Sequence, residues 1–421
     1  MKSHEIEINY LQNGLQLAVN KMKETETVVF NIWVKSGSRY EKSENNGIAH
    51  FMEHMAFKGT KSRSAEEIAI AFDDIGGSVN AHTSREHTVY HAKVLKEDWE
   101  MALDIMADII QNSAFVEEEL ERERQVILQE IAMTEDTPDD IVFDHYLATA
   151  YPNQPLGYSI LGTTECVQSF KTDDFRKYLA SQYSADRIVL AVAGAVENEK
   201  ILHAVNEKFS AMPRFSVGVQ QSANYCGGEF RAQKPLEQIQ IVLGFKSSSY
   251  QEKEKYKTQL LANMLGGSMS SRLFQEIREK RGLAYSIGAG QMSFDDTGIF
   301  TVHAGTSPEQ AETLIKVTCE ELKKATHNLT QSELDRARKQ MLSGWRMGVE
   351  RASFRADEIG RQLCCFNRLV EFSEIESELA EVNLKSLHGL AENLWQQPIT
   401  VASLGDLSYM PSLEKIQSYL S

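Results

Sequence analysis

The chain has 421 residues, 42% hydrophobic and 25% charged, an ordinary globular composition in a chain long enough for two or more domains. Its formal net charge of -16 argues against nucleic acid as a partner, because nucleic-acid-binding surfaces are basic. No run approaches the ~20 apolar residues of a membrane span, and the N-terminus lacks an apolar signal core. The five cysteines form no C-x-x-C pair, which favours a reducing compartment. We therefore expect a cytoplasmic protein with no membrane partner.

The first strands are predicted from alternating apolar residues. These alternate on both sides of Asn13-Gly14, a pair that strongly favours a tight turn, so residues 6–19 predict a β-hairpin. The segment TVVFNIWVKSGS predicts a third strand, which leads toward a helix within residues 47–60.

That helix carries a motif with metal-binding spacing, H-x-x-E-H, in the segment GIAHFMEHMAFKGT. His50 and His54 are four residues apart, so on a helix they point the same way, one turn apart. Two imidazoles at this spacing can hold one zinc ion. Glu53 lies beside the same face, from which it can reach a water on the metal. Two histidines can also fall four apart by chance, so the motif requires a third ligand.

Capping residues indicate where the helices around this motif begin and end. Asn45 or Asn46 can cap the start of the motif helix, and Gly59 suits its end. Ser64-Ala65-Glu66-Glu67 has the pattern of a capping box and opens a helix that stops at Gly76-Gly77. Further along, the predicted elements are two strands within 78–95, helices at 98–110 and about 116–133, a helix after Pro138, a buried strand in RIVLAVAGAV and a helix ending near Ala211. The hairpins favour an antiparallel α+β layer over a doubly wound sheet.

The motif with its flanks resembles the M16 (pitrilysin) metallopeptidases, especially the subfamily of the mitochondrial processing peptidase β subunit and its bacterial homologues. H-x-x-E-H is the inverzincin signature. In that family a glutamate about 76 residues after the second histidine completes the zinc site, and counting on from His54 gives Glu130. The resemblance also implies a second functional glutamate seven residues earlier, Glu123. The alternative for either is a solvated acid on a charged helix.

The second half of the chain repeats the first. WVKSGSRYEK matches GFKSSSYQEK, and VAGAV matches SLGDL, both at an offset of 211, while ELERERQVIL matches ELDRARKQML at 214. These matches predict an internal duplication, with an N-terminal domain at 1–212, a linker at 213–228 and a C-terminal domain at 229–421. The zinc set falls on apolar or small residues in the second half: Leu261, Met264, Leu265, Ala337 and Gly344. We therefore expect zinc in the first domain and no metal ligands in the second.

The second half carries a segment of its own that resembles the family. LANMLGGSMSSRLFQEIREKRGLAYSIGAG matches the segment that supplies an arginine and a tyrosine, seven residues apart, to the substrate or transition state. The matching positions are Arg278 and Tyr285, with Arg281 as the competing arginine. The alternative is that Arg278 is one more charge on an exposed helix and that Tyr285 is an aromatic residue of the core.

The segment Asn80-Ala81-His82-Thr83 matches a strand that, in relatives, lies at a sheet edge and pairs with the extended substrate backbone. Such pairing gives affinity through main-chain hydrogen bonds. A metal role for His82 or His87 is disfavoured, because a three-ligand set already exists elsewhere.

The resemblance implies two similar LuxS/MPP-like metallohydrolase domains, α+β in class, each an antiparallel sheet with helices packed on it. It further implies a zinc-dependent endopeptidase that hydrolyses peptides or unfolded, presequence-like polypeptides, with one Zn2+ per chain on His50, His54 and Glu130. Glu53 is then the general base, and Glu123 orients a ligand histidine. A homodimeric clam-shell chamber is the simplest assembly, with a heterodimer possible. The runner-up is a non-catalytic scaffold or partner subunit of an M16-like complex.

Overall fold

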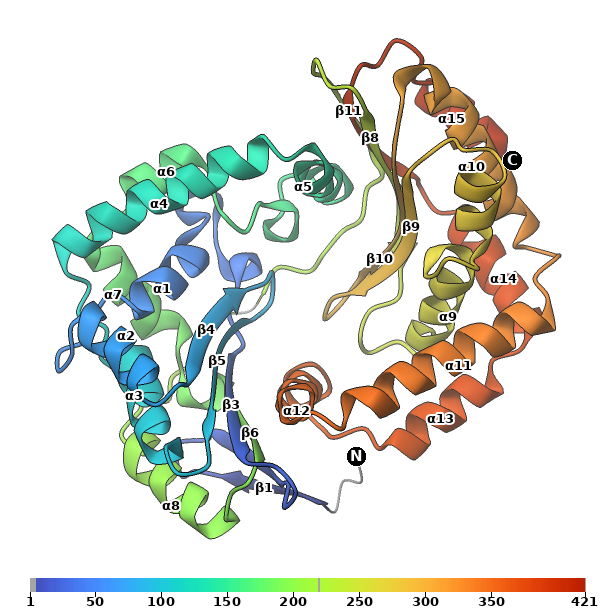
Figure 1. Ribbon diagram of the computed structural model, residues 1–421. Coiled ribbons are helices and arrows are strands. Elements are labelled where there is room, and N and C mark those ends of the chain that lie inside the picture. The colour runs from blue at the N-terminus through green and yellow to red at the C-terminus, as the bar shows by residue number, and fades with distance from the viewer. Residues whose placement is uncertain (1–4, 219, 421) are drawn as a thin grey trace. The chain divides into compact units, whose positions relative to one another are not determined.

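The computed structural model describes residues 5–218 and 220–420, which form two compact units. Unit 1 comprises the described residues of 1–132, 158–221 and 345–372, and unit 2 comprises 133–157, 222–344 and 373–420. Each unit contains one β-sheet with helices packed on it (Figure 1).

The sheet of unit 1 has six strands in the order β1-β2-β6-β3-β5-β4. All neighbours are antiparallel except β2 and β6, which run parallel. The strands are β1 (Ile6–Tyr10), β2 (Gln16–Lys21), β3 (Thr27–Val34), β4 (Ser78–Thr83), β5 (Thr88–Leu95) and β6 (Ile188–Gly194). β6 is buried along its whole length, which explains its uninterrupted apolar sequence. β4 is the last strand in this order and therefore lies at an edge of the sheet.

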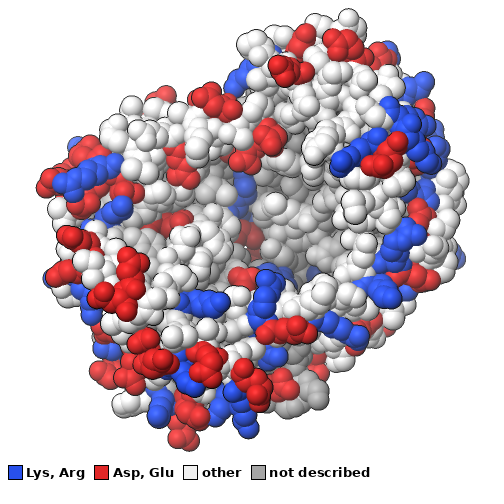
Figure 2. Space-filling view, viewed as in Figure 1, with Lys and Arg blue, Asp and Glu red and all other residues white. Residues whose placement is uncertain are grey.

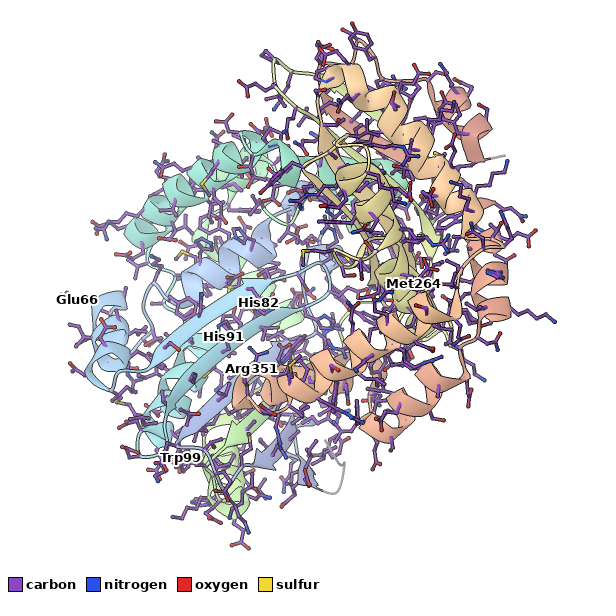
Figure 3. The ribbon with its side chains drawn as sticks, turned by 45° about the vertical axis from the view of Figure 1, so that its right-hand side comes forward. Glu66, His82, His91, Trp99, Met264 and Arg351 are labelled. Carbon is purple, nitrogen blue, oxygen red and sulfur yellow. The ribbon has the colours of Figure 1, made fainter. Side chains whose placement is uncertain are left out.

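The main core of unit 1 lies between one face of this sheet and helices of the same unit. Alternate strand residues such as Phe30 and Ile32 point into this core, whereas Trp33 points to the opposite face. The helices that contribute to the core are α1 (Ile48–Ala56), α2 (Ala65–Asp74), α3 (Trp99–Gln111), α4 (Glu117–Glu135), α6 (Thr164–Ser169), α7 (Thr172–Gln182) and α8 (Asn198–Phe209). Trp99 begins α3 and Glu66 lies in the first turn of α2 (Figure 3).

The sheet of unit 2 repeats this topology. Its order β7-β11-β8-β10-β9 matches β2-β6-β3-β5-β4, and the first pair, β7 with β11, is again parallel while the others are antiparallel. Its strands are β7 (Gly228–Gln233), β8 (Ile239–Ser247), β9 (Ser286–Ser293), β10 (Gly298–Thr306) and β11 (Thr400–Gly405). Its helices are, in the main, α9 (Lys255–Gly266), α10 (Ala311–Lys324), α11 (Gln331–Gly348), α13 (Phe372–Glu381), α14 (Leu384–Trp395) and α15 (Leu413–Leu420). The predicted duplication is confirmed.

Each unit contains one helix from the other half of the sequence. α12 (Ala352–Phe366) packs on β3 and β6 of unit 1, where Ile359 and Leu363 cover Trp33 and its neighbours. α5 (Pro138–Ala150) packs on β8 and β11 of unit 2, where Tyr146 joins the apolar cluster. The two helices begin 214 residues apart, so they occupy matching places in the duplication. The compact units are therefore discontinuous in sequence, whereas the expected domains were continuous stretches.

The predicted hairpin, the two strands within 78–95 and the helices around them are present with boundaries within a few residues. Ser64 accepts a hydrogen bond from the backbone N–H of Glu67, so the predicted capping box exists. None of the helices in the described ranges is long and apolar enough to span a membrane. On the face seen in Figure 2, acidic side chains are interspersed with basic ones in both units.

Candidate metal centre

Helix α1 positions the two motif histidines. Its apolar residues Phe51, Met52 and Met55 are fully buried in the core of unit 1, which fixes the rotation of the helix. His50 is buried and His54 is partly exposed, with ring centroids 4.6 Å apart. The two rings therefore lie next to each other on the side of α1 that the apolar residues leave free.

Glu130, on α4, meets both rings. Its Oε2 lies 3.6 Å from Nε2 of His50 and 3.7 Å from Nε2 of His54. Ligand atoms about 2.0–2.1 Å from a tetrahedral zinc lie roughly 3.3 Å apart, so the spacing suits this metal. Two imidazoles and one carboxylate are also the donor set of known catalytic zinc sites, which keep a fourth position for water. Within the described residues, these three form the only such group of potential ligands.

Glu123, two turns before Glu130 on α4, contacts His54. Its Oε2 lies 2.9 Å from Nδ1 of His54, which leaves Nε2 directed at Glu130. Its other oxygen forms a 2.5 Å ion pair with Nζ of Lys58. Burial by itself raises the pKa of Glu123, but the hydrogen bonds from His54 and Lys58 outweigh it and lower the pKa. Glu123 is therefore a carboxylate at neutral pH and can hold the histidine in one tautomer.

Glu53 lies on the same helix but outside the group of three. Its Oε2 accepts a 2.5 Å hydrogen bond from the hydroxyl of Thr83, at the end of β4. Burial raises the pKa of Glu53 and the Glu130 carboxylate adds to the rise, while the bond from Thr83 opposes it. A carboxylate with a raised pKa and a fixed orientation is suited to taking up a proton.

The two imidazoles differ in charge preference. Burial, assisted by the neighbouring His54, lowers the pKa of His50 to about 3, so its ring is neutral at physiological pH, as metal binding requires. Burial also lowers the pKa of His54, but the Glu123 bond and the nearby carboxylates outweigh it and raise the pKa. Glu123, Glu53 and Glu130 thus all lie near His54, and a divalent metal would compensate their charge.

The start of α1 corrects one expectation. Neither Asn45 nor Asn46 caps the helix: Gly47 is the N-cap, with φ of 96°, and provides no side chain. The buried carboxyl group of Glu41, whose pKa burial raises to about 8, takes over this role by accepting hydrogen bonds from the backbone N–H groups of Gly47 and Ala49, both at 2.8 Å. Asn46 instead donates to Glu41 at 2.9 Å. A chain reversal brings Glu41 back over the helix start, and local spacing rules do not anticipate it.

Arg278 and Tyr285 lie together in unit 2, the unit that does not carry the metal group. The Arg278 guanidinium lies 4.8 Å from the centroid of the Tyr285 ring and 4.7 Å from that of Phe274. Tyr285 is 78% exposed, which excludes the alternative of a core aromatic residue. Arg281 turns elsewhere and pairs with Glu276 at 2.6 Å. The geometry therefore pairs Tyr285 with Arg278 rather than Arg281.

The segment from Asn80 to Thr83 lies on β4, the edge strand of unit 1. Asn80 and His82 are exposed, whereas Ala81 between them is buried. His82 lies 6.1 Å from the ring of His91 on β5 (Figure 3), and His87 packs against Trp33. Neither His82 nor His87 belongs to the metal-ligand group found in the described chain.

Sequence reasoning missed two side chains that support this centre, Lys58 and Glu41. Lys58 lies within the segment GIAHFMEHMAFKGT, four residues after His54 and two residues beyond the end of α1, so its nearness in sequence to His54 was the only available signal. Glu41 had no comparable signal, because it contacts the helix start across a turn.

Comparison with known proteins places this arrangement in a family. Residues 16–164 match the family model described as Insulinase (Peptidase family M16), and residues 169–341 match the one described as Peptidase M16 inactive domain. The chain belongs to peptidase family M16. It is 41% identical to an uncharacterized zinc protease of Rickettsia felis over 94% of this chain and 97% of that protein. It is 32% identical to the mitochondrial-processing peptidase subunit beta of Bos taurus, over 98% and 87% of the two chains.

A solved protease from Helicobacter pylori has the same fold as this M16 chain, with a TM-score of 0.89 at 25% identity over 95% of this chain and 99% of that one. The description of the second match as an inactive domain agrees with α9. There the positions that match the H-x-x-E-H residues are Leu261, Met264 and Leu265, all buried and apolar (Figure 3 labels Met264).

Proposed function

We propose that this M16 chain is a zinc-dependent endopeptidase with one zinc ion per chain. The observation that carries the proposal is the group of His50, His54 and Glu130, whose donor atoms lie within 4.8 Å of one another, with Glu53 on the same helix. Three ligands of this type leave a coordination position open, which distinguishes a catalytic zinc site from a structural one.

In this proposal Glu53 moves the proton. Zinc held by this donor set lowers the pKa of water and polarises a carbonyl group. Glu53 accepts the proton of the attacking water and delivers it to the leaving amine of the peptide bond. Thr83 fixes the Glu53 carboxylate by its 2.5 Å hydrogen bond, so that one oxygen stays available.

The substrate we propose is an extended peptide or unfolded polypeptide. β4 lies at an edge of the sheet of unit 1, and an edge strand can pair with an extended chain through its outward backbone groups. Arg278 and Tyr285 would bind the peptide and stabilise the oxyanion, for which the exposed Tyr285 hydroxyl is suited. We also propose that two chains form a homodimer in which this pair serves the zinc of the partner. A cytoplasmic location stays a prediction.

The test compares variants of the full chain on mixed unfolded peptides, with and without chelator. Glu53→Gln keeps the shape of the side chain but cannot accept the proton, so we expect cleavage to fall by about 10²–10⁴-fold while zinc remains bound. Glu130→Gln should lose most of its zinc. Glu66→Gln, an exposed residue of α2, is the matched control and should retain both.

Wild-type activity in Glu53→Gln, or wild-type cleavage after complete removal of the metal, would contradict the proposal. Zinc binding without any cleavage in the wild-type chain would favour a scaffold or partner subunit.

A further inference from the structure

Unit 1 contains a cavity of about 590 Å³ that none of the metal-centre residues lines. It lies between the C-terminal end of α3, the segment 112–115, α7 and the segment 211–213. Its volume is within the range of about 300–1,000 Å³ that small-molecule sites span. Its accessible lining includes the apolar residues Ala114, Leu179 and Pro213 and the cations Lys61 and Arg176.

The charge of this cavity is opposite to that of the chain. The protein has a net charge of -16, yet among the described residues that line the cavity two are cations and none is acidic. The ammonium of Lys61 is exposed and forms no ion pair within the described ranges. Arg176 pairs at 2.9 Å with Asp173, but both side chains are largely exposed, so the pair contributes little and can open.

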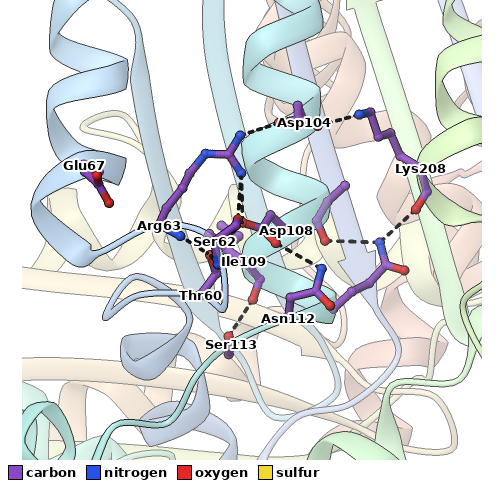
Figure 4. Close-up of polar contacts among 12 residues, drawn as sticks. Thr60, Ser62, Arg63, Glu67, Asp104, Asp108, Ile109, Asn112, Ser113 and Lys208 are labelled. Atoms are coloured by element: carbon purple, nitrogen blue, oxygen red, sulfur yellow. Dashed lines mark hydrogen bonds and ion pairs between the residues drawn. The ribbon is translucent and has the colours of Figure 1, made fainter.

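A polar network holds one wall of the cavity in place (Figure 4). Asp108 accepts hydrogen bonds from the hydroxyls of Thr60 and Ser62, both at 2.6 Å, and from Arg63 at 2.8 Å. The backbone of the same loop bonds the cavity segment, with the N–H of Lys61 donating to Asn112 at 3.1 Å. This bond ties the loop that carries Lys61 to the segment 112–115, which lines the cavity.

The segment 112–115 contains a strained residue. Phe115 has φ of +50°, a left-handed conformation that is rare for a bulky residue. Its buried ring packs at 5.8 Å against Phe175 of α7. The fold maintains this conformation in a segment that lines the cavity.

We propose that this cavity is a binding site for a small molecule with an apolar chain and a single anionic head group, such as a medium-chain carboxylate. The apolar chain lies against the accessible apolar lining of Ala114, Leu179 and Pro213, and the carboxylate pairs with Lys61 and Arg176. The site is distinct from the metal centre and does not depend on peptidase activity.

The test is a titration of the full chain with decanoate, decanol and acetate, followed by calorimetry. We expect saturable decanoate binding, weaker decanol binding and no acetate binding, because affinity requires both the apolar chain and the charge. The double variant Lys61→Ala/Arg176→Ala should bind decanoate roughly three- to tenfold more weakly, with decanol binding unchanged. Lys177→Ala, next to Arg176 on α7 but outside the cavity, is the matched control and should behave as wild type.

Ala180→Trp places a large side chain into the cavity from the exposed face of α7 and should abolish decanoate binding. Ala211→Trp does the same from the other side, so the test survives if one variant fails to fold. Absent binding in the wild type, equal affinity in the double variant, or undiminished binding in both folded tryptophan variants would overturn the proposal.

Discussion

At the scale of single residues, a chain of contacts lies behind the candidate ligand His54. Lys58 contacts one oxygen of Glu123, and the other oxygen contacts His54. Each contact fixes the orientation of the next group, so the outermost side chain influences the ligand without touching it. Partners of this kind typically change metal affinity by about 10–100-fold when they are removed.

We expect Lys58→Met to weaken zinc binding by about tenfold, because Glu123 then loses its cation and rotates more freely. The measurement is competition with a chelator of known affinity. Lys93→Met, on an exposed position of β5, is the control and should not change zinc affinity. If both variants bind zinc as the wild type does, Lys58 has no part in orienting Glu123.

At the scale of elements, glycine decides how closely a helix can approach the sheet. A Cβ at Gly360 of α12 would lie 2.1 Å from Nε1 of Trp33 on β3, a distance at which something must shift. Gly344 of α11 has no atom within 4 Å of the same position. We therefore expect substitution by alanine to have opposite effects on stability at these two helical glycines, although the intrinsic helix propensities involved are the same.

We expect Gly360→Ala to destabilise unit 1 by roughly 1–3 kcal/mol, since overpacking outweighs the better helix propensity of alanine. Gly344→Ala should stabilise by about 0.5–1 kcal/mol. Thermal unfolding of both variants beside the wild type provides the comparison. Equal shifts in the two variants would mean that α12 does not pack against Trp33 as described.

The loop that follows the metal helix has a pH-dependent anchor in Asp108. Burial by itself raises the pKa of Asp108, but hydrogen bonds from Ser62, Thr60 and Asn112 outweigh it and lower the pKa. An acid whose pKa is lower in the folded state stabilises the fold above its unfolded pKa of about 3.9, and this contribution is lost as the pH falls through the folded pKa.

Asp108→Asn should therefore lower the stability of unit 1 at pH 7 by about 1–3 kcal/mol. The difference from the wild type should shrink as the pH falls below about 4. The observable is the unfolding midpoint measured at a series of pH values. A difference that stays constant down to pH 3 would show that the charge of Asp108 is not what stabilises the loop.

At the scale of the whole molecule, the two units carry different candidate site residues. Unit 1 carries the candidate metal group and unit 2 carries Arg278 with Tyr285, while α9 of unit 2 has apolar residues where α1 has candidate ligands. If two chains form the proposed homodimer, every complete site needs both units.

Glu53→Gln and Tyr285→Phe should each be weakly active as homodimers. In a mixed dimer one of the two sites receives an intact Glu53 from one chain and an intact Tyr285 from the other, by the geometry of a two-fold assembly. Mixing the variants under conditions of subunit exchange should therefore restore activity. If exchange is demonstrated and no activity returns, the pair does not act across the dimer.

The sequence by itself determined the features that depend on local spacing. The H-x-x-E-H helix, the hairpin at Asn13-Gly14 and the capping box at Ser64 follow from helical and strand periods and from turn chemistry, which act over a few residues. The duplication was also visible, because corresponding elements recur at offsets of 211 and 214 residues. These patterns lie in short stretches of sequence, so they can be read without knowing the tertiary structure.

Only the tertiary structure decided the contacts between residues far apart in the chain. No periodic signal in the sequence indicates three of these features. They are the exchange of α5 and α12 between the two halves, the position of Glu41 at the start of α1, and the presence of Lys61 and Arg176 at one cavity. Each depends on how sheets and helices pack once their apolar faces are buried. The burial of apolar surface is non-directional, so the spacing of apolar residues along the chain does not determine which elements come to lie next to each other.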